Sequence, residues 1–254
     1  MKKTILLIFT LFILSSCGVS PSEGDKNITL DFVKQHIDNS YLDLRSLGLT
    51  KVPEFSKILP QAVLEDVLFI DLSNNEIRKI PDEFKKFPNL KEVNLSFNKI
   101  KKLENLNNIK LLRKVEVYEN ELKSVNLKNV PNLKYLDLSY NNLESGDLED
   151  IFKLTGLTEL QLLRNNIKSI EGIEALTSLE VIKLEFNQIK DISPLDSLKN
   201  LKFVSVAENP LDKALIEKWI KFTQDNMGYT KEEPEVIKLT QPEEKTDKDS
   251  VLEI

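Results

Sequence analysis

Residues 133–143 read LKYLDLSYNNL, with aliphatic residues at the first, fourth, sixth and last positions and an Asn at the ninth. Residues 90–100 (LKEVNLSFNKI) and 179–189 (LEVIKLEFNQI) follow the same pattern. Within Leu136-Asp137-Leu138 the apolar residues alternate, which is the period of a β-strand with one buried face. A single strand of this kind cannot bury its leucines alone, so the pattern predicts that several copies stack.

The same frame recurs along most of the chain, and its Asn marks the period. Successive copies are separated by 23, 22, 21, 24, 22 and 22 residues, with the Asn at Asn75, Asn98, Asn120, Asn141, Asn165, Asn187 and Asn209. An earlier, eighth copy at 42–49 has Leu47 in the Asn position. We expect each Asn amide to bond backbone groups of its own turn and of the next one, which is a structural role.

This pattern resembles the leucine-rich repeat family, and a period near 22 residues is common in bacterial internalin-like proteins. The resemblance covers residues 41–211, about eight repeats. It implies an α/β fold: a curved right-handed solenoid with a parallel β-sheet on its concave face and short 3₁₀ or α segments and loops on its convex face. The 24-residue copy is expected to carry one longer helix over 148–154.

A cap is expected at each end of the solenoid, because both ends would otherwise expose core side chains. Residues 27–40 are expected to form the first cap, with a helix over 29–37 (TLDFVKQHI) whose His36 is a surface residue rather than a catalyst. Residues 55–64 are expected to form a helical insertion within the long first spacing. The sequence therefore predicts short helices on both sides of the first copy of the repeat.

Residues 212–228 are expected to form the second cap, as a helix with an apolar stripe made of Leu215, Ile216, Trp219 and Ile220. The alternative for this stripe is contact with a membrane or a partner. Residues 229–254 contain two prolines and many charges, which predicts a disordered tail. A docking role for this tail is the alternative.

The first 26 residues predict export and lipid anchoring. After Lys2 and Lys3, residues 5–14 (ILLIFTLFIL) would span about 15 Å as a helix, half of a bilayer core of about 30 Å, which is typical of a signal peptide. Residues 14–17 (LSSC) resemble the bacterial lipobox. This implies a signal peptide at 1–16, diacylglycerol on Cys17 and a flexible tether over 17–26. An ordinary secretory signal with a chance Cys is the alternative.

Composition argues against several function classes. The formal charge of −6 disfavours general nucleic-acid binding, and one Cys and one His leave no cysteine cluster or multi-histidine metal site. The seven glycines form no phosphate-binding motif. Carboxylates such as Glu116 and Asp137 would lie on an open sheet without an evident pocket for acid–base catalysis. We therefore expect neither an enzyme nor a cofactor, metal or small-molecule substrate.

Outward strand positions are where this family commonly binds protein ligands. The position between the two strand leucines carries Asp43, Asp71, Asn94, Glu116, Asp137, Gln161, Lys183 and Ser205. Aromatic and apolar residues lie just before or after it, and such a mixture is typical of interfaces, although strand propensity on a solvated sheet also explains it. The predicted protein-binding residues are Tyr41, Phe69, Glu116, Tyr118, Tyr135, Asp137, Leu163, Val181, Lys183 and Phe203.

The sequence thus predicts a monomeric, lipid-anchored protein of the bacterial cell envelope that binds another protein through its concave face. If the source has two membranes, we expect it on the outer membrane or the cell surface. A surface adhesin that contacts a host is the specific version and follows from family analogy. The alternative is an envelope scaffold that binds a partner from the same cell.

Overall fold

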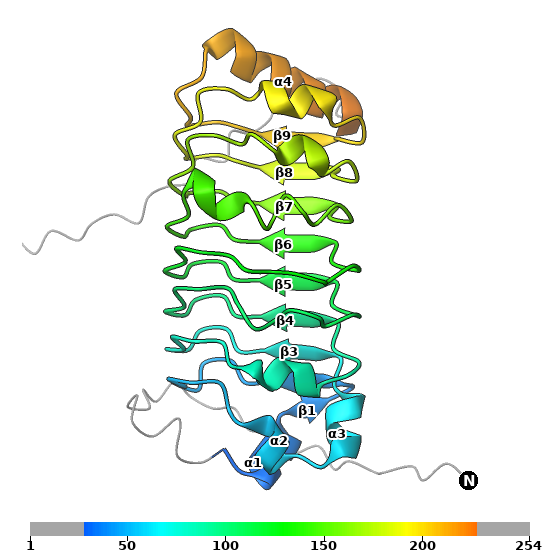
Figure 1. Ribbon diagram of the computed structural model, residues 1–254. Helices are drawn as coiled ribbons and strands as arrows, with labels where there is room; N and C mark the ends of the chain where they lie inside the picture. The colour runs from blue at the N-terminus through cyan, green and yellow to red at the C-terminus, as the bar shows by residue number, and fades with distance from the viewer. Residues whose placement is uncertain (1–27, 228–254) are drawn as a thin grey trace, which may run out of the picture.

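The computed structural model describes residues 28–227 as a single stack of turns joined by one sheet (Figure 1). The predicted signal peptide, Cys17, the tether and the charged tail at 229–254 lie outside the described residues. The sheet has nine strands in sequence order. They are β1 (Ile37–Asp38), β2 (Tyr41–Asp43), β3 (Phe69–Asp71), β4 (Glu92–Asn94), β5 (Lys114–Glu116), β6 (Tyr135–Asp137), β7 (Glu159–Gln161), β8 (Val181–Lys183) and β9 (Phe203–Ser205).

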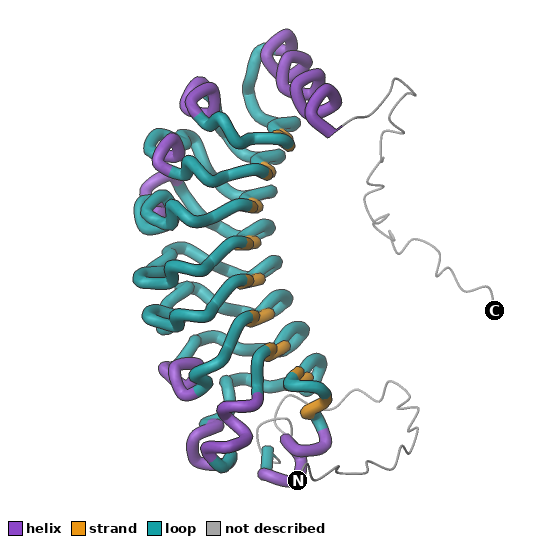
Figure 2. Tube along the Cα trace, turned by 90° about the vertical axis from the view of Figure 1, so that its right-hand side faces the viewer, coloured by secondary structure: helices purple, strands orange, loops and turns teal. Residues whose placement is uncertain are grey.

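Strands β2 to β9 are parallel. Each strand pairs with the strand of the preceding repeat, and equivalent residues of the two repeats lie side by side. Figure 2 shows the strands along the concave side of an arc, with short helices along the convex side. Four of these convex helices are 3₁₀ segments: η1 (Asp82–Lys86), η2 (Ser145–Leu148), η3 (Ile173–Ala175) and η4 (Ser193–Ser197). The predicted leucine-rich repeat architecture is therefore confirmed.

The aliphatic positions of the repeat form the core between the sheet and the convex segments. In the repeat of β6, Leu133, Leu136, Leu138 and Leu143 are 1% exposed or less. The corresponding residues of the other turns stack on them in one continuous cluster. Because each turn buries its leucines only against its neighbours, no repeat is expected to be stable alone.

The Asn side chains connect each turn to the preceding one. Asn141 Oδ1 accepts a hydrogen bond from Leu122 N–H, and its Nδ2 donates to the carbonyls of Val117, Leu138 and Ser139. Val117 and Leu122 belong to the preceding repeat. The expectation that each Asn bonds the following turn was therefore wrong, because it bonds the preceding one. The preceding turn supplies the backbone groups that need partners there, the Leu122 N–H and the Val117 carbonyl.

The N-terminal cap differs in detail from the expectation. Helix α1 (Leu30–Gln35) begins after Thr29, whose hydroxyl oxygen accepts a hydrogen bond from Phe32 N–H. The helix ends at Gln35, two residues earlier than expected, because Ile37–Asp38 pair antiparallel with β2. His36 Nδ1 lies 2.8 Å from the carbonyl oxygen of Phe32, and the two rings stack.

Two further helical expectations have different outcomes. The insertion at 55–64 consists of two short helices, α2 (Phe55–Ile58) and α3 (Gln61–Asp66). The single longer helix expected over 148–154 is wrong: η2 ends at Leu148 and turns follow up to Lys153. Phe152 N–H still bonds the carbonyl of Leu148, so one helical turn forms there without continuing.

Helix α4 (Lys213–Met227) covers the last strand (Figure 1). Trp219 is 4% exposed and packs edge-on against Phe222, 5.1 Å between ring centroids. Thr223 Oγ1 accepts a hydrogen bond from Val204 N–H and donates one to Val204 O, which satisfies the open edge of β9. Ile220 is 48% exposed, so it is not part of the buried stripe. No helix in residues 28–227 combines the length and apolarity needed to span a bilayer.

Candidate functional site

The strand register arranges the outward side chains of the concave face in columns. The middle residue of each strand is buried, so the first and third residues point to the opposite side. We call these the first column and the third column. The first column is Tyr41, Phe69, Glu92, Lys114, Tyr135, Glu159, Val181 and Phe203, and the third column runs from Asp43 to Ser205.

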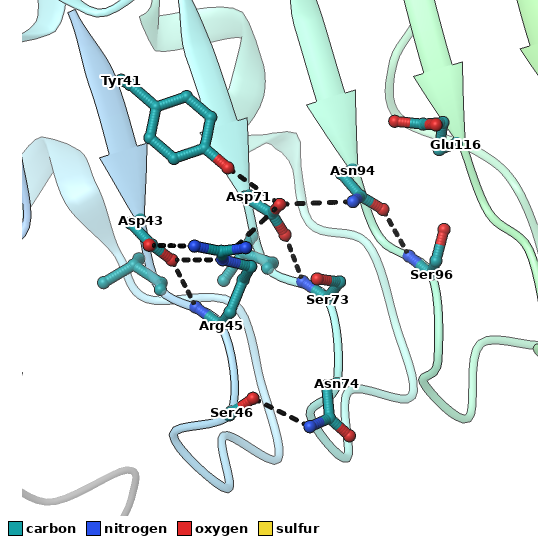
Figure 3. A network of polar contacts seen from close by, with 12 residues as sticks. Tyr41, Asp43, Arg45, Ser46, Asp71, Ser73, Asn74, Asn94, Ser96 and Glu116 are labelled. Carbon is teal, nitrogen blue, oxygen red and sulfur yellow. Dashed lines mark hydrogen bonds and ion pairs between the residues drawn. The ribbon is translucent and has the colours of Figure 1, made fainter. Parts of the chain in front are cut away.

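At the N-terminal end of the concave face, the side chains of Asp43 and Asp71 already have partners within the chain (Figure 3). Arg45 binds Asp43 with two hydrogen bonds of 2.9 and 2.7 Å, and this contact lowers the pKa of Asp43 despite its partial burial. Asp71 is 7% exposed and accepts hydrogen bonds from Tyr41 Oη at 2.9 Å and Asn94 Nδ2 at 3.2 Å. Burial and the Asp71 bond raise the pKa of Tyr41 to about 12. This end is a satisfied polar network.

The middle of the concave face holds a second network around Tyr135. Lys114 Nζ lies 5.0 Å from the centre of the Tyr135 ring and 3.1 Å from Glu116 Oε2. Gln161 Nε2 donates a 3.0 Å hydrogen bond to Tyr135 Oη. Burial is the main cause of the raised pKa of Tyr135, with nearby acids adding to it. Tyr135 is therefore a half-buried member of the surface rather than a free ring.

Asp137 departs from the expectation of an outward, solvated acid. It is 8% exposed, and its Oδ1 accepts a 2.9 Å hydrogen bond from Ser139 N–H. Burial raises its pKa above the ordinary value for an aspartate, although the Ser139 bond acts in the opposite direction. Asp71 and Asp137 face the concave side but are covered by their neighbours, which the alternation of residues does not reveal.

The apolar residues of the predicted patch do not form one continuous surface. Tyr41 pairs with Phe69 at one end of the first column, and Val181 with Phe203 at the other. Charged side chains separate these two pairs from Tyr135. Lys183 lies in the third column, with Nζ 3.5 Å from Gln161 Oε1. Tyr118 and Leu163 lie outside both columns, two residues beyond the third-column residue of their repeats.

Tyr118 instead belongs to a row of rings along the edge of the concave face. Its ring centroid lies 5.2 Å from that of Phe97 and 4.9 Å from that of Tyr140. The Arg164 guanidinium continues the row, 5.3 Å from the Tyr140 ring and 4.4 Å from the Phe186 ring. We call these five residues the aromatic ladder. It spans four repeat steps, about 19 Å at about 4.8 Å a step.

The residue before each Asn position supplies most of the aromatic ladder and has an unusual backbone. All eight such residues have φ between 51° and 58° and so adopt the left-handed conformation: Ser46, Asn74, Phe97, Glu119, Tyr140, Arg164, Phe186 and Glu208. Asn is favoured there, whereas a bulky side chain costs on the order of 1 kcal/mol or more. Four of the eight residues in this column are nevertheless large: Phe97, Tyr140, Arg164 and Phe186.

Comparison with known proteins agrees with this architecture. The family described as leucine-rich repeats (two copies) matches residues 67–108, 131–176 and 155–197. This chain has the leucine-rich repeat fold. No curated protein sequence matches it at a significant level.

Three solved structures share the fold at low sequence identity. Internalin F of Listeria monocytogenes is 20% identical, with a TM-score of 0.50 over 76% of this chain and 62% of that one. Internalin C2 of the same species is 21% identical, with a TM-score of 0.51 over 66% and 80%. A leucine-rich repeat protein of Leptospira interrogans is 24% identical, with a TM-score of 0.50 over 73% and 59%. This chain thus matches less than two thirds of internalin F and of the Leptospira protein.

Within the leucine-rich repeat frame, sequence reasoning missed Phe97, Tyr140, Arg164 and Phe186. Side chains alternate between two faces only within a strand, whereas these four residues lie in the turn that follows it. The sequence did contain a signal, because each of these four residues directly precedes one of the regularly spaced Asn residues. In residues 28–227, no group of three or more His, Cys, Asp or Glu side chains is placed to hold a metal ion.

Proposed function

We propose that this chain is a lipid-anchored envelope protein that binds another protein through its concave face and the aromatic ladder. The observation that carries the proposal is the ladder itself. Phe97 is 47% exposed, and from it rings and the Arg164 guanidinium continue over four repeat steps. Aromatic residues and Arg beside polar groups are enriched at protein interfaces.

A protein partner fits this surface better than a small molecule. The surface is open and about 19 Å long, whereas small-molecule sites are concave and bury most of their ligand. The leucine-rich repeat fold is typically non-catalytic, and similar folds in internalins support a binding role. Anchoring through Cys17 is supported by the LSSC stretch, and an outward-facing adhesin is the specific form that we propose.

Site-specific photo-crosslinking in the native cell tests the binding surface. A photoreactive residue would replace Lys183 on the concave face or, as the matched control, the exposed Lys86 in η1 on the convex side. We expect a discrete protein adduct from position 183 and none from position 86. Absence of an adduct at position 183, or the same adduct from both, contradicts binding through the concave face.

Two further measurements address the anchor and the location. Cys17→Ala should prevent partitioning of the protein into a detergent phase, and unchanged partitioning would contradict lipidation. Protease treatment of intact cells should remove the folded part while an internal control protein stays intact. Full protection until the outer layer is opened would favour the scaffold that binds a partner from the same cell.

A further inference from the structure

The residue directly before each parallel strand belongs to a row along the edge of the sheet opposite the aromatic ladder. From β2 to β9 this row is Ser40, Leu68, Lys91, Arg113, Lys134, Thr158, Glu180 and Lys202. Three successive repeats supply a cation here, and we call Lys91, Arg113 and Lys134 the basic row. The Arg113 N–H bonds the carbonyl of Lys91, and the Lys134 N–H bonds that of Arg113, so the three residues are immediate neighbours.

The charge of the basic row is not paired within the chain. None of its members forms an ion pair with a residue of the described range 28–227. Lys134 Nζ donates a 2.8 Å hydrogen bond to the carbonyl of Gly156, which is uncharged. Arg113 and Lys134 are exposed, and Lys91 is partly buried. Because like charges at neighbouring positions of a sheet destabilise it, this local positive edge is a cost in a chain whose formal charge is −6.

The same row shows that a carboxylate fits between neighbouring repeats at this edge. Glu180 and Lys202 occupy the row in two successive repeats, and Lys202 Nζ lies 2.7 Å from Glu180 Oε2. The Lys202 N–H bonds the backbone carbonyl of Glu180, which is the relation that also joins the members of the basic row. A carboxylate at this edge is therefore within reach of a cation one repeat away. In the basic row all three positions carry cations, so the carboxylates have to come from another molecule.

We propose that the basic row binds an acidic segment of the partner protein. This inference rests on the proposed function and specifies the charge of the partner beside β4, β5 and β6. The row spans two repeat steps, about 10 Å at about 4.8 Å a step, which is the length of about three residues of an extended chain. Carboxylates of such a segment can pair with the two lysines and accept both hydrogen bonds of the Arg113 guanidinium fork.

A flat anionic membrane fits this edge less well than an acidic protein segment does. Beyond Lys134, the next repeats place Glu159 in the first column and Glu180 in the row itself. A flat anionic surface along the edge would approach these carboxylates as well as the cations. A segment about three residues long ends before it reaches them.

Fluorescence anisotropy of hexaglutamate carrying an uncharged dye tests the binding, with the full chain kept in non-ionic detergent micelles. The neutral peptide hexaglutamine with the same dye is the control. We expect saturable binding of hexaglutamate only, which weakens as salt is added. The net negative charge of the chain opposes this binding, so it requires a local positive site. Absence of saturation, or equal binding of hexaglutamine, would overturn the proposal.

Two matched triple variants remove the same charges from opposite edges of the sheet. The first neutralises the basic row with Lys91→Gln, Arg113→Gln and Lys134→Gln. The control changes one Arg and two Lys that lie three or four residues past the Asn position, are exposed and form no ion pair among residues 28–227: Arg78→Gln, Lys102→Gln and Lys123→Gln.

Hexaglutamate binding should weaken about five- to tenfold in the first triple variant and less than about twofold in the control. The double variant Lys91→Arg, Lys134→Arg keeps both charges and should bind as the unsubstituted chain does. Equal losses in the two triple variants would show that only the overall charge matters. That result, or a loss in the charge-preserving double variant, contradicts a specific site at the basic row.

Crosslinking in the native cell distinguishes this inference from the proposed function. If the chain with a neutralised basic row still forms the adduct from position 183 with undiminished yield, the concave face binds a partner and the basic row does not contribute. If the unsubstituted chain forms no adduct, the proposed function is wrong, whatever the titration shows. A photoreactive residue in place of the exposed Lys110, three residues before Arg113, should give the same protein adduct as position 183. An adduct with lipid instead would assign this edge to the membrane and overturn the proposal.

Discussion

Asn141 Oδ1 accepts a 2.9 Å hydrogen bond from the backbone N–H of Leu122, nineteen residues earlier in the chain. The same side chain donates to Val117 O at 2.9 Å, so it satisfies a buried donor and a buried acceptor of the preceding repeat. Six of the seven Asn side chains in this position are buried: Asn75, Asn98, Asn120, Asn141, Asn165 and Asn187. The ladder of Asn side chains therefore holds adjacent repeats together where the chain leaves the sheet.

Replacing Asn141 should strongly destabilise the fold. Asn141→Ala leaves the Leu122 N–H without its partner and costs about 2–4 kcal/mol in the free energy of unfolding. The neighbouring Asn142 is exposed, so Asn142→Ala is the matched control and should change stability by at most about 0.5 kcal/mol. Urea unfolding followed by circular dichroism measures both. Similar losses in the two variants would mean that the amide is not the source of stability.

Helix α4 should be needed to protect the C-terminal end of the solenoid. Trp219→Ala removes a side chain that is 4% exposed and should lower the free energy of unfolding by about 3–5 kcal/mol. The next residue, Ile220, is 48% exposed, and Ile220→Ala should cost at most about 0.5 kcal/mol. Thermal unfolding and hydrogen exchange at β9 provide the measurement. Unchanged exchange at β9 in Trp219→Ala would contradict the capping role.

The buried acid Asp137 should make the fold less stable as the pH rises. Its folded pKa is raised by burial, so the folded state binds more protons than the unfolded state between the ordinary carboxyl pKa of 3.8 and the raised value. Stability therefore falls as the pH rises through this window. Asp137→Asn keeps an oxygen that can accept the Ser139 N–H bond. It should raise the free energy of unfolding at pH 7, and the gain should disappear below pH 3.8.

Asp43, in the same third column, gives the opposite sign and serves as the control. The Arg45 contact lowers its folded pKa, so its contribution is present above the unfolded pKa and is lost as the pH falls through the lowered value. Asp43→Asn should therefore destabilise at pH 7, by less than about 1 kcal/mol because the pair is partly exposed. A gain from Asp43→Asn, or a loss from Asp137→Asn at neutral pH, would contradict these assignments.

The repeat, the parallel sheet and the core could be predicted from the sequence because each depends on a local period. Leu136, Asp137 and Leu138 alternate, and only stacking buries the leucines. The short strand β1 was missed because Ile37 continues the apolar face of α1, and pairing with β2 outweighs two residues of helix. The end of η2 at Leu148 depends on packing between turns, which no helical period reports.

The candidate site was harder to predict than the fold. Alternation assigns Asp137 to the concave face, but whether neighbours cover it depends on side chains from other repeats. The aromatic ladder depends on residues 21–24 apart in sequence, and the column that holds Phe97 and Tyr140 follows the strand. That column becomes conspicuous once its left-handed backbone is known, since Asn rather than an aromatic ring suits it.

Phe97 provides a test that separates binding from stability. In Phe97→Asn the side chain suits a φ of 56° better, and this gain offsets the lost contact with the Tyr118 ring. We therefore expect the free energy of unfolding to change by at most about 0.5 kcal/mol, while the yield of the protein adduct from position 183 falls severalfold. The control is Leu111→Ala, which removes another exposed apolar side chain (38% exposed) that is not part of the ladder, and should leave the adduct unchanged. If Phe97→Asn unfolds more easily and binds normally, the ring stabilises the turn, and the cost of its left-handed backbone has a structural cause rather than a functional one.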